Sequence, residues 1–238
     1  MNNIVIIGST GAIGAAFTRY YAGLDTSPAV YALSRSGVPA DDTRVTALPM
    51  DITDESSVAQ AAAALEATPL HAVILATGVL HDNASLQPEK SLRDIDADNL
   101  ARVFSINTVG PALVMKHFLP LLDRNNRALF CALSARVGSI SDNRLGGWYA
   151  YRASKAALNM LIRTAAVEMK RRNPQAIILG LHPGTVDSAL SRPFQRRVPE
   201  GKLFTADTAV ARMAAVLEAA GTDDSGKCLA WDGREITP

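Results

Sequence analysis

The sequence predicts an α/β fold: a single Rossmann-type, doubly wound parallel sheet of about seven strands, with helices on both faces. Its apolar runs are continuous rather than alternating, as expected for strands that are buried on both faces. Helical patterns separate nearly all of these runs, which is the element order of a parallel sheet. The length of 238 residues suits one domain over residues 1–238, and an apolar content of 48% supplies a sizeable core.

The elements follow from these patterns in order. In the first part of the chain we expect a strand at residues 4–7, a helix at 12–21, strands at 29–33 and 45–48, a helix at 55–66 and a strand at 71–76. In the second part we expect a helical region at 91–124 broken near Gly110-Pro111, a strand at 128–133, a helix at 148–172, a strand at 176–181, a helix at 206–219 and a short strand at 227–231. Asp54 is a suitable N-cap for the helix that begins at Glu55.

Composition excludes several classes of function. A formal net charge of +1 gives no general attraction to nucleic acid or to a membrane surface. No apolar run reaches the roughly 18 residues of a membrane span, and no leader-like segment precedes the first strand, so we expect a cytoplasmic protein. Cys131 and Cys228 lie in strand-like runs and are expected to be buried free thiols. The four histidines lack ligand spacing, so no metal site is expected, and no G-x-S-x-G nucleophile elbow occurs.

A glycine-rich segment, Gly-Ser-Thr-Gly-Ala-Ile-Gly at residues 8–14, follows the first strand and opens a helix. Glycines permit the tight turn and the close approach of a pyrophosphate, which would face the free N–H groups of the helix N-terminus. The segment is not a P-loop, because no lysine follows Gly14 at the required place. It favours a dinucleotide site, and the alternative is a strand-to-helix turn without a ligand. Its predicted binding residues are Gly8, Ser9, Thr10, Gly11, Ile13 and Gly14.

The ends of the next two strands indicate which nucleotide is bound. The second strand ends in Ser34-Arg35 and carries no acid for the ribose hydroxyls of NAD. A guanidinium at this place suits the 2′-phosphate of NADP, so NADP is predicted over NAD; the alternative is an ordinary exposed arginine. Asp51, followed by Ile52, could accept from the adenine amino group or could serve as a capping residue.

Tyr151 and Lys155 are four residues apart in a predicted helix and therefore share a face. A free tyrosine has a pKa near 10, and a neighbouring ammonium favours its phenolate form. The pair is a plausible proton donor for the reduction of a carbonyl. An exposed helix pair without a function is the alternative for the bare pattern.

The residues around this pair carry a family resemblance. Residues 134–140 read Ser-Ala-Arg-Val-Gly-Ser-Ile, and residues 146–159 read Gly-Gly-Trp-Tyr-Ala-Tyr-Arg-Ala-Ser-Lys-Ala-Ala-Leu-Asn. Together with the glycine segment they resemble the short-chain dehydrogenase/reductase family, in particular its branch of C-factor and sniffer-type carbonyl reductases. The resemblance extends over the whole chain.

The resemblance implies roles for individual residues. Tyr151 would be the general acid–base, Lys155 would lower its pKa and hold the nicotinamide ribose, and Asn107 would hold a water in a proton relay. From the residues alone, Asn107 is a polar side chain in an apolar helix, consistent with a kink before Gly110. The adenosine side would be supported by Ala76, Thr77 and Gly78, and the nicotinamide side by Pro183, Gly184, Val186 and Ser188.

The sequence departs from the family at the serine that polarises the substrate carbonyl. The usual Ser-Ser pair reads Ser134-Ala135 here. We favour Ser134 as the catalytic hydroxyl, with Ser139 and Ser141 as the alternatives.

These observations predict reversible hydride transfer between NADP(H) and a small carbonyl or alcohol. The alternative is a cofactor-binding signalling or regulatory protein with little or no turnover. Residues 187–202 are expected to cover the substrate. A homodimer or homotetramer that packs through residues 101–122 and 151–170 is expected from the resemblance.

Overall fold

The computed structural model describes residues 1–37, 42–82 and 85–238 of the chain. A seven-stranded sheet lies at its centre, and every neighbouring pair of strands is parallel. Its strand order is β3 (Val45–Pro49), β2 (Ala29–Ser34), β1 (Asn3–Ile7), β4 (Ala72–Leu75), β5 (Ala128–Leu133), β6 (Ala176–His182) and β9 (Cys228–Ala230). The strand order reverses between β1 and β4, which is the place where doubly wound sheets bind their ligands. The predicted fold class is confirmed.

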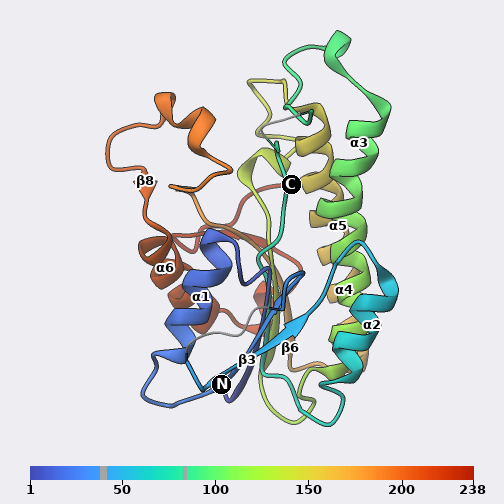
Figure 1. The fold of residues 1–238 in the computed structure, drawn as a ribbon, viewed down its shortest axis with the longest axis vertical. Helices are drawn as coiled ribbons and strands as arrows, with labels where there is room; N and C mark the ends of the chain where they lie inside the picture. Colours follow the sequence, from blue (N-terminus) through green and yellow to red (C-terminus); the bar gives the residue numbers. More distant parts are fainter. Residues whose placement is uncertain (38–41, 83–84) are drawn as a thin grey trace.

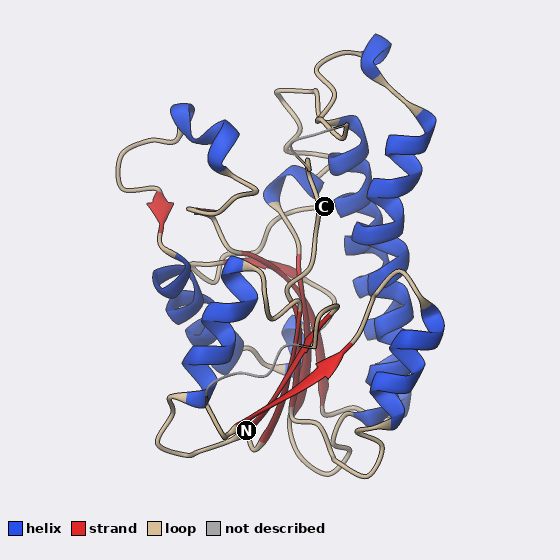
Figure 2. Ribbon diagram, in the orientation of Figure 1, coloured by secondary structure: helices blue, strands red, loops and turns tan. Residues whose placement is uncertain are grey.

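Helices cover both faces of the sheet (Figures 1 and 2). One face carries α1 (Ala12–Ala22) and α6 (Ala206–Ala219); the other carries α2 (Glu55–Ala63), α4 (Gly110–Phe118) and α5 (Tyr149–Arg172). The side chains of β1 alternate between the two cores, since Val5 and Ile7 face α5 whereas Ile4 and Ile6 face α1. Because both sets must be apolar, the strand reads as one continuous apolar run.

The helical region predicted at residues 91–124 is organised differently from the prediction. It consists of the 3₁₀ turn η1 (Leu92–Asp94), α3 (Ala97–Phe104), the π turn η2 (Ser105–Val109), α4 and the 3₁₀ turn η3 (Leu119–Leu121). The regular α-helix is interrupted just before Gly110-Pro111, near the predicted break, but the chain passes from α3 to α4 through the π turn and stays helical. Gly110 packs closely against the loop between β3 and α2. A Cβ added to Gly110 would lie 2.9 Å from the backbone oxygen of Ile52 in that loop.

Most other boundaries agree with the predictions within a few residues, and β5 and α6 agree at both ends. Asp54 caps α2 as predicted, since its side chain accepts from Ser56 N. Helix α5 begins at Tyr149 rather than at Trp148, which has a left-handed conformation with a φ of 53°. Two short strands were not predicted: β7 (Thr185–Val186) pairs with β8 (Leu203–Phe204) and closes a segment that contains the 3₁₀ turn η5 (Arg192–Arg197).

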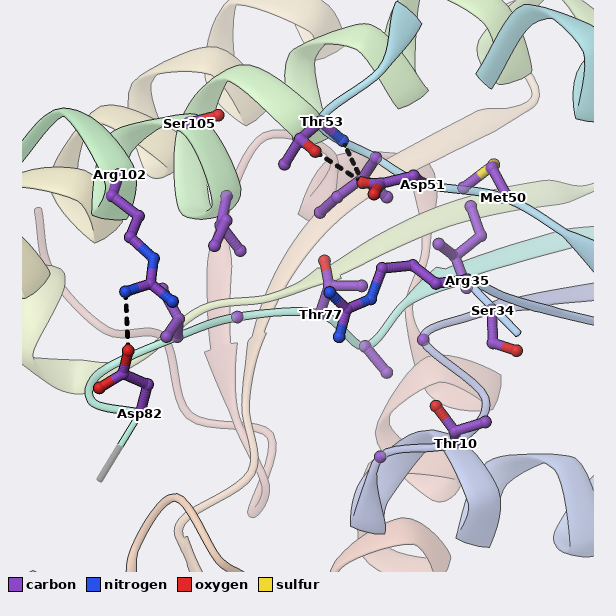
Figure 3. A pocket seen from close by; sticks show the side chains of 18 residues that line it. Thr10, Ser34, Arg35, Met50, Asp51, Thr53, Thr77, Asp82, Arg102 and Ser105 are labelled. Atoms are coloured by element: carbon purple, nitrogen blue, oxygen red, sulfur yellow. Dashed lines mark hydrogen bonds and ion pairs between the residues drawn. The ribbon is translucent and has the colours of Figure 1, made fainter. Parts of the chain in front are cut away.

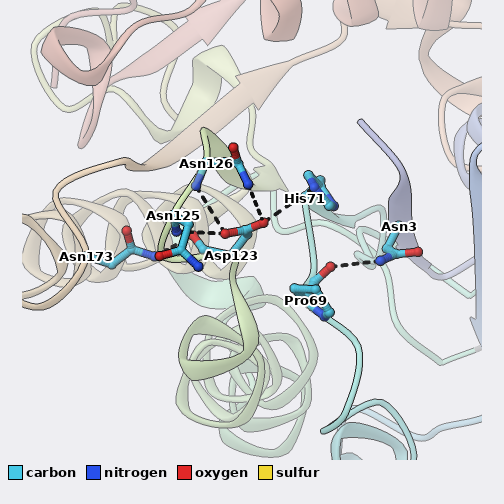
Figure 4. A network of polar contacts seen from close by, with 7 residues as sticks. All are labelled: Asn3, Pro69, His71, Asp123, Asn125, Asn126 and Asn173. Atoms are coloured by element: carbon cyan, nitrogen blue, oxygen red, sulfur yellow. Dashed lines mark hydrogen bonds and ion pairs between the residues drawn. The ribbon is translucent and has the colours of Figure 1, made fainter.

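A polar cluster ties together the amino ends of three strands (Figure 4). The carboxylate of Asp123 accepts from the backbone N–H groups of Asn125 and Asn126 and from the Asn126 amide, and His71 Nε2 lies 3.5 Å away. The Asn173 amide donates to the backbone oxygen of Asp123. The Asn126 side chain, followed by the Asn125 backbone, lowers the pKa of Asp123. This cluster lies at the edge of the sheet opposite to the cavities described below.

Cys131 and Cys228 are buried and free, as predicted. None of the helices in the described ranges has the length and apolar character needed to cross a membrane.

Candidate functional site

Two cavities lie beyond the carboxyl ends of the strands. The larger, of about 680 Å³, is bordered by the segments that follow β1, β2, β3 and β4. The smaller, of about 270 Å³, is bordered by the ends of β5 and β6, the start of α5 and part of residues 187–198. They meet at the glycine-rich loop and at residues 78–80, because Gly11 and Val79 border the larger cavity whereas Ile13 and Leu80 border the smaller.

Ten of the predicted cofactor residues line the larger cavity (Figure 3): Gly8, Thr10, Gly11, Ser34, Arg35, Asp51, Ile52, Ala76, Thr77 and Gly78. Ile13, Pro183, Gly184, Val186, Ser188 and Tyr151 line the smaller one. Ser9, Gly14 and Lys155 line neither cavity and lie behind their walls.

The glycine-rich loop is shaped by close backbone contacts. Gly8 N and Ser9 N both donate to the Leu33 oxygen, which fastens the loop to the end of β2. Gly8 has a φ of 86°, and a Cβ added to Gly14 would lie 2.1 Å from the Gly8 oxygen. Gly11, the N-cap of α1, offers no side-chain cap, so the first N–H groups of the helix stay available to an anion. This cradle fits the pyrophosphate of a dinucleotide.

Arg35 and Asp51 face the larger cavity from neighbouring strand ends (Figure 3). Within the described part of the chain, the exposed Arg35 guanidinium makes no hydrogen bond or ion pair, so it stays free for an anionic ligand. Asp51 Oδ1 accepts from Thr53 N at 2.9 Å and from Thr53 Oγ1 at 2.7 Å. These hydrogen bonds from Thr53 lower the pKa of Asp51. Asp51 thus shapes the turn before α2, whereas the helix cap itself is Asp54.

Thr77 contributes a polar atom without a partner to the wall of the larger cavity. Its Oγ1 is fully enclosed and has no hydrogen-bond partner in the described structure. Enclosed hydroxyls are normally hydrogen-bonded, so the Thr77 hydroxyl is an exception at this cavity wall. The sequence lacked this signal, because a hydroxyl's partner depends on the packed structure.

Asn107 connects three elements from within the π turn. Its Oδ1 accepts from Val79 N at 2.8 Å, and its Nδ2 donates to Val79 O at 2.8 Å and to Ser154 Oγ at 3.1 Å. The side chain is 1% exposed. Its hydrogen bonds therefore hold the loop after β4 against α5, close to Tyr151 and Lys155.

Lys155 and Tyr151 extend from the first turns of α5 toward the strand ends. Lys155 Nζ donates to the Leu133 oxygen at 2.8 Å and lies 5.8 Å from the centroid of the Tyr151 ring. Burial raises the pKa of Tyr151 to about 12 and lowers the pKa of Lys155 to about 8. Burial of the phenol is the cause of the rise in the Tyr151 pKa, and the lowering of this pKa by the Lys155 ammonium stays a prediction.

The three candidate serines make hydrogen bonds of their own. Ser134 Oγ donates to Asn159 Oδ1 at 2.6 Å. Ser139 Oγ accepts from Asp142 N, and Ser141 Oγ donates to the Pro238 oxygen. Only Ser134 borders the cavity that contains Tyr151. Among the described residues, no hydrogen bond joins a serine to the Tyr151 hydroxyl.

Aromatic side chains form the outer wall of the smaller cavity. The Trp148 ring makes edge contacts with Phe194, at 4.8 Å between centroids, and with Tyr151, at 6.3 Å. The buried Glu89 fixes this corner, because its backbone oxygen accepts from Trp148 N at 2.5 Å and its carboxylate accepts from Ala150 N at 3.2 Å. Trp148 was not predicted as a site residue from the sequence; its position three residues before Tyr151 was the available signal.

Comparison with known proteins identifies the family. The sequence profile of the family described as short chain dehydrogenase matches residues 2–198. The chain therefore belongs to the short-chain dehydrogenase family of oxidoreductases, as the resemblance predicted.

Two sequence relatives and two solved structures illustrate the similarity of this chain to known proteins. The C-signal protein of Myxococcus xanthus is 32% identical over 146 residues, which cover 61% of this chain and 82% of that protein. The 1-hydroxy-2-glutathionyl-2-methyl-3-butene dehydrogenase of Rhodococcus sp. (strain AD45) is 31% identical over 186 residues, with 77% and 76% coverage. The NADPH-bound carbonyl reductase from chicken fatty liver superposes with a TM-score of 0.84 at 25% identity, over 100% of this chain and 99% of that one. The carbonyl reductase Sniffer of D. melanogaster shares the fold with a TM-score of 0.86 at 21% identity, over the full length of both chains.

Proposed function

We propose that this protein is an NADP(H)-dependent oxidoreductase that transfers a hydride between the nicotinamide cofactor and a carbonyl or alcohol substrate. The observation that carries the proposal is the position of Tyr151, which lines an apolar cavity next to a larger cavity shaped for a dinucleotide. The structural similarity to an NADPH-bound carbonyl reductase supports the same conclusion.

The larger cavity would hold the adenosine and phosphate parts of NADP. Gly8, Thr10 and Gly11 would face the pyrophosphate, with Ser9 and Gly14 fixing the loop. Ser34 and Arg35 would bind the 2′-phosphate through charge-assisted hydrogen bonds. The adenosine would be bordered by Asp51, Ile52, Ala76, Thr77 and Gly78.

The nicotinamide would extend into the smaller cavity. Ile13, Pro183, Gly184, Val186 and Ser188 border this region, and Lys155 lies behind Tyr151 where it would hold the ribose. When bound, NADPH supplies the hydride that the protein itself lacks.

The chain's own residues would manage the proton. The Tyr151 hydroxyl would donate its proton to the carbonyl oxygen as the alcohol forms and would recover it in the reverse direction. A positive charge on Lys155 or on an oxidised nicotinamide would favour the phenolate of Tyr151 against the effect of burial. Asn107 would hold the loop after β4 against α5 through its hydrogen bonds to Val79 and Ser154. It would also support a water in the proton relay. Ser134 would reach the substrate oxygen only by turning its hydroxyl away from Asn159.

The consumption of NADPH with a panel of aldehydes and ketones tests this proposal. Tyr151→Phe removes the proton donor and keeps the ring, so kcat should fall on the order of 10²–10⁴-fold. NADPH binding, followed by fluorescence, is the control and should change little. Equal turnover by the two proteins would exclude the role of Tyr151.

A second candidate function is a nucleotide-binding signalling or regulatory protein. The hydrogen bond of Ser134 to Asn159 favours it, since it leaves Tyr151 without a serine partner. The similarity to a protein named C-signal is consistent with it. This candidate requires NADPH binding with no turnover of any carbonyl in the same panel.

A further inference from the structure

His182 is a half-buried titratable group that the proposed reaction does not yet use. It is the last residue of β6 and lines the same cavity as Tyr151. Its Nδ1 is fully enclosed and has no hydrogen-bond partner among the described residues. Its Nε2 is not enclosed in this way, and within the described chain it likewise makes no hydrogen bond. The ring therefore offers the cavity a nitrogen that the protein does not satisfy.

The protonation state of this ring follows from its surroundings. Burial, followed by the positive charge of Arg136, lowers the pKa of His182 to about 4, with Asp232 acting weakly in the opposite direction. The imidazole is therefore neutral near pH 7 and carries one N–H. An enclosed N–H without an acceptor is rarer and more costly than an enclosed lone pair without a donor. The proton consequently belongs on Nε2, the nitrogen that is not enclosed.

The position of His182 matches that of Ser134 in the neighbouring strand. Leu133 of β5 pairs with Leu181 of β6, so Ser134 and His182 are the next residues in register on one face of the sheet. Ser134 already donates its hydroxyl proton to Asn159, and the following residue, Ala135, has no hydroxyl. At the ends of these two strands, His182 is thus the side chain whose proton is uncommitted.

We propose that His182 is a catalytic residue whose Nε2–H donates a hydrogen bond to the carbonyl oxygen of the substrate, alongside the Tyr151 hydroxyl. This inference rests on the proposed function. The carbonyl carbon accepts the hydride from NADPH, the π electrons of the C=O bond move to the oxygen, and the oxygen takes the Tyr151 proton. His182 keeps its own proton throughout and stabilises the negative charge that develops on the oxygen. Neutral imidazole is a suitable donor for polarising a carbonyl.

Two variants separate the hydrogen bond from the shape of the ring. His182→Phe keeps a planar ring without a donor, and His182→Gln places an amide N–H near the position of Nε2. With benzaldehyde as the probe and saturating NADPH, kcat should fall on the order of 10²–10³-fold in His182→Phe, and His182→Gln should recover at least tenfold of that loss. The Kd for NADPH should stay within about twofold of wild type in both variants.

Two results with these variants would overturn the inference. One is a His182→Phe variant with wild-type kcat, and another is a loss confined to NADPH affinity, which would place His182 against the cofactor. If the wild-type protein turns over no carbonyl in the panel, both the proposed function and this inference fail. If the wild type is active and His182→Phe has the same kcat, only this inference fails.

A measurement on the wild-type protein covers the case in which His182→Phe does not fold. Long-range ¹H–¹⁵N spectra of the NADP⁺ complex at pH 7 report the tautomer of each histidine, and the His182→Gln variant identifies the His182 signal. The Nε2–H tautomer is expected for His182. The Nδ1–H tautomer or an imidazolium would overturn the assignment.

Discussion

We expect Arg35 to discriminate between the two nicotinamide cofactors. It borders the larger cavity at the end of β2, and its guanidinium makes no hydrogen bond or ion pair within the described ranges, although its charge acts on nearby Asp51. No carboxylate follows β2 at the place where one would bind the ribose hydroxyls of NAD. The chemistry of this strand end therefore suits a phosphate on the adenosine ribose.

Replacing Arg35 by Ala should weaken NADPH binding about tenfold or more, because a charge-assisted hydrogen bond to phosphate is lost. NADH binding should change by less than about threefold, since NADH lacks that phosphate. Fluorescence titration with both cofactors measures the difference. Arg44→Ala is a matched control, because Arg44 is already paired with Asp42. Equal losses for the two cofactors in Arg35→Ala would refute the assignment.

Lys155 should give the stability of the protein a distinctive pH dependence. Its pKa is lowered by burial from 10.5 to about 8 in the folded protein. Between these values the unfolded chain binds more protons than the native one, so the free energy of unfolding rises with pH in this window. Below pH 8 the buried Lys155 is charged, and its desolvation lowers the free energy of unfolding by the full amount. This destabilisation disappears as the pH approaches 10.5, because the lysine is then neutral in the folded protein.

Lys155→Met lacks this titration. The stability of wild type relative to Lys155→Met should therefore increase by up to about 3 kcal/mol between pH 7 and pH 10.5. Urea unfolding of both proteins at the two pH values measures this change. The upward shift of the Tyr151 pKa acts above pH 10 in both proteins and cancels. A difference that does not depend on pH would show that Lys155 is not desolvated.

The elements differ in how well the sequence alone could predict them. The core strands were predictable because each is buried on both faces and must be apolar along its length. The π turn, the left-handed Trp148 and the short pair β7–β8 were not, since they depend on contacts between distant segments. Val186 pairs with Phe204, and Trp148 N donates to the Glu89 oxygen, and neither contact leaves a periodic pattern in the sequence.

The junction between β1 and α1 offers a test at the scale of an element. A Cβ at Gly14 would lie 2.1 Å from the Gly8 oxygen, so Gly14→Ala should displace the loop that faces the pyrophosphate. We expect at least a tenfold loss of NADPH affinity together with a lower melting temperature, measured by titration and thermal unfolding. Gly221→Ala is the control, because no atom lies within 4 Å of its added Cβ and both properties should be unchanged. Wild-type affinity in Gly14→Ala would show that the loop is not so tightly packed.

On the scale of the whole molecule, the residues that line both cavities meet at the carboxyl edge of the sheet. The convergence of Gly8, Arg35 and Thr77 on the larger cavity could be predicted, because the ends of parallel strands meet at one edge although these residues are far apart in sequence. The substrate side was less predictable. The hydrogen bond of Ser134 to Asn159 and the unpartnered nitrogens of His182 depend on side-chain packing that the sequence does not display.

The outer surface of α4 and α5 bears on the proposed oligomer (Figure 1). Val109, Met160 and Val167 are 51%, 65% and 49% exposed on the helical layer expected to form the subunit contact. We expect a homodimer or homotetramer in sedimentation velocity, and Met160→Glu should shift it toward the monomer because a charge would be buried in the contact. Leu145→Glu, on a loop residue that is 91% exposed, is the control. A monomeric wild type at micromolar concentration would contradict this expectation.

Under the proposed function, the two cavities together hold the cofactor and the substrate for hydride transfer. The most direct test supplies the wild-type protein with NADPH deuterated at C4 of the nicotinamide and a panel of aldehydes and ketones, and analyses the products by mass spectrometry and NMR. We predict an alcohol with deuterium on its carbinol carbon when the transferred face of the nicotinamide is labelled, and a strongly reduced yield with Tyr151→Phe. NADPH binding without any deuterated alcohol from either labelled face, across the panel, would contradict the claim.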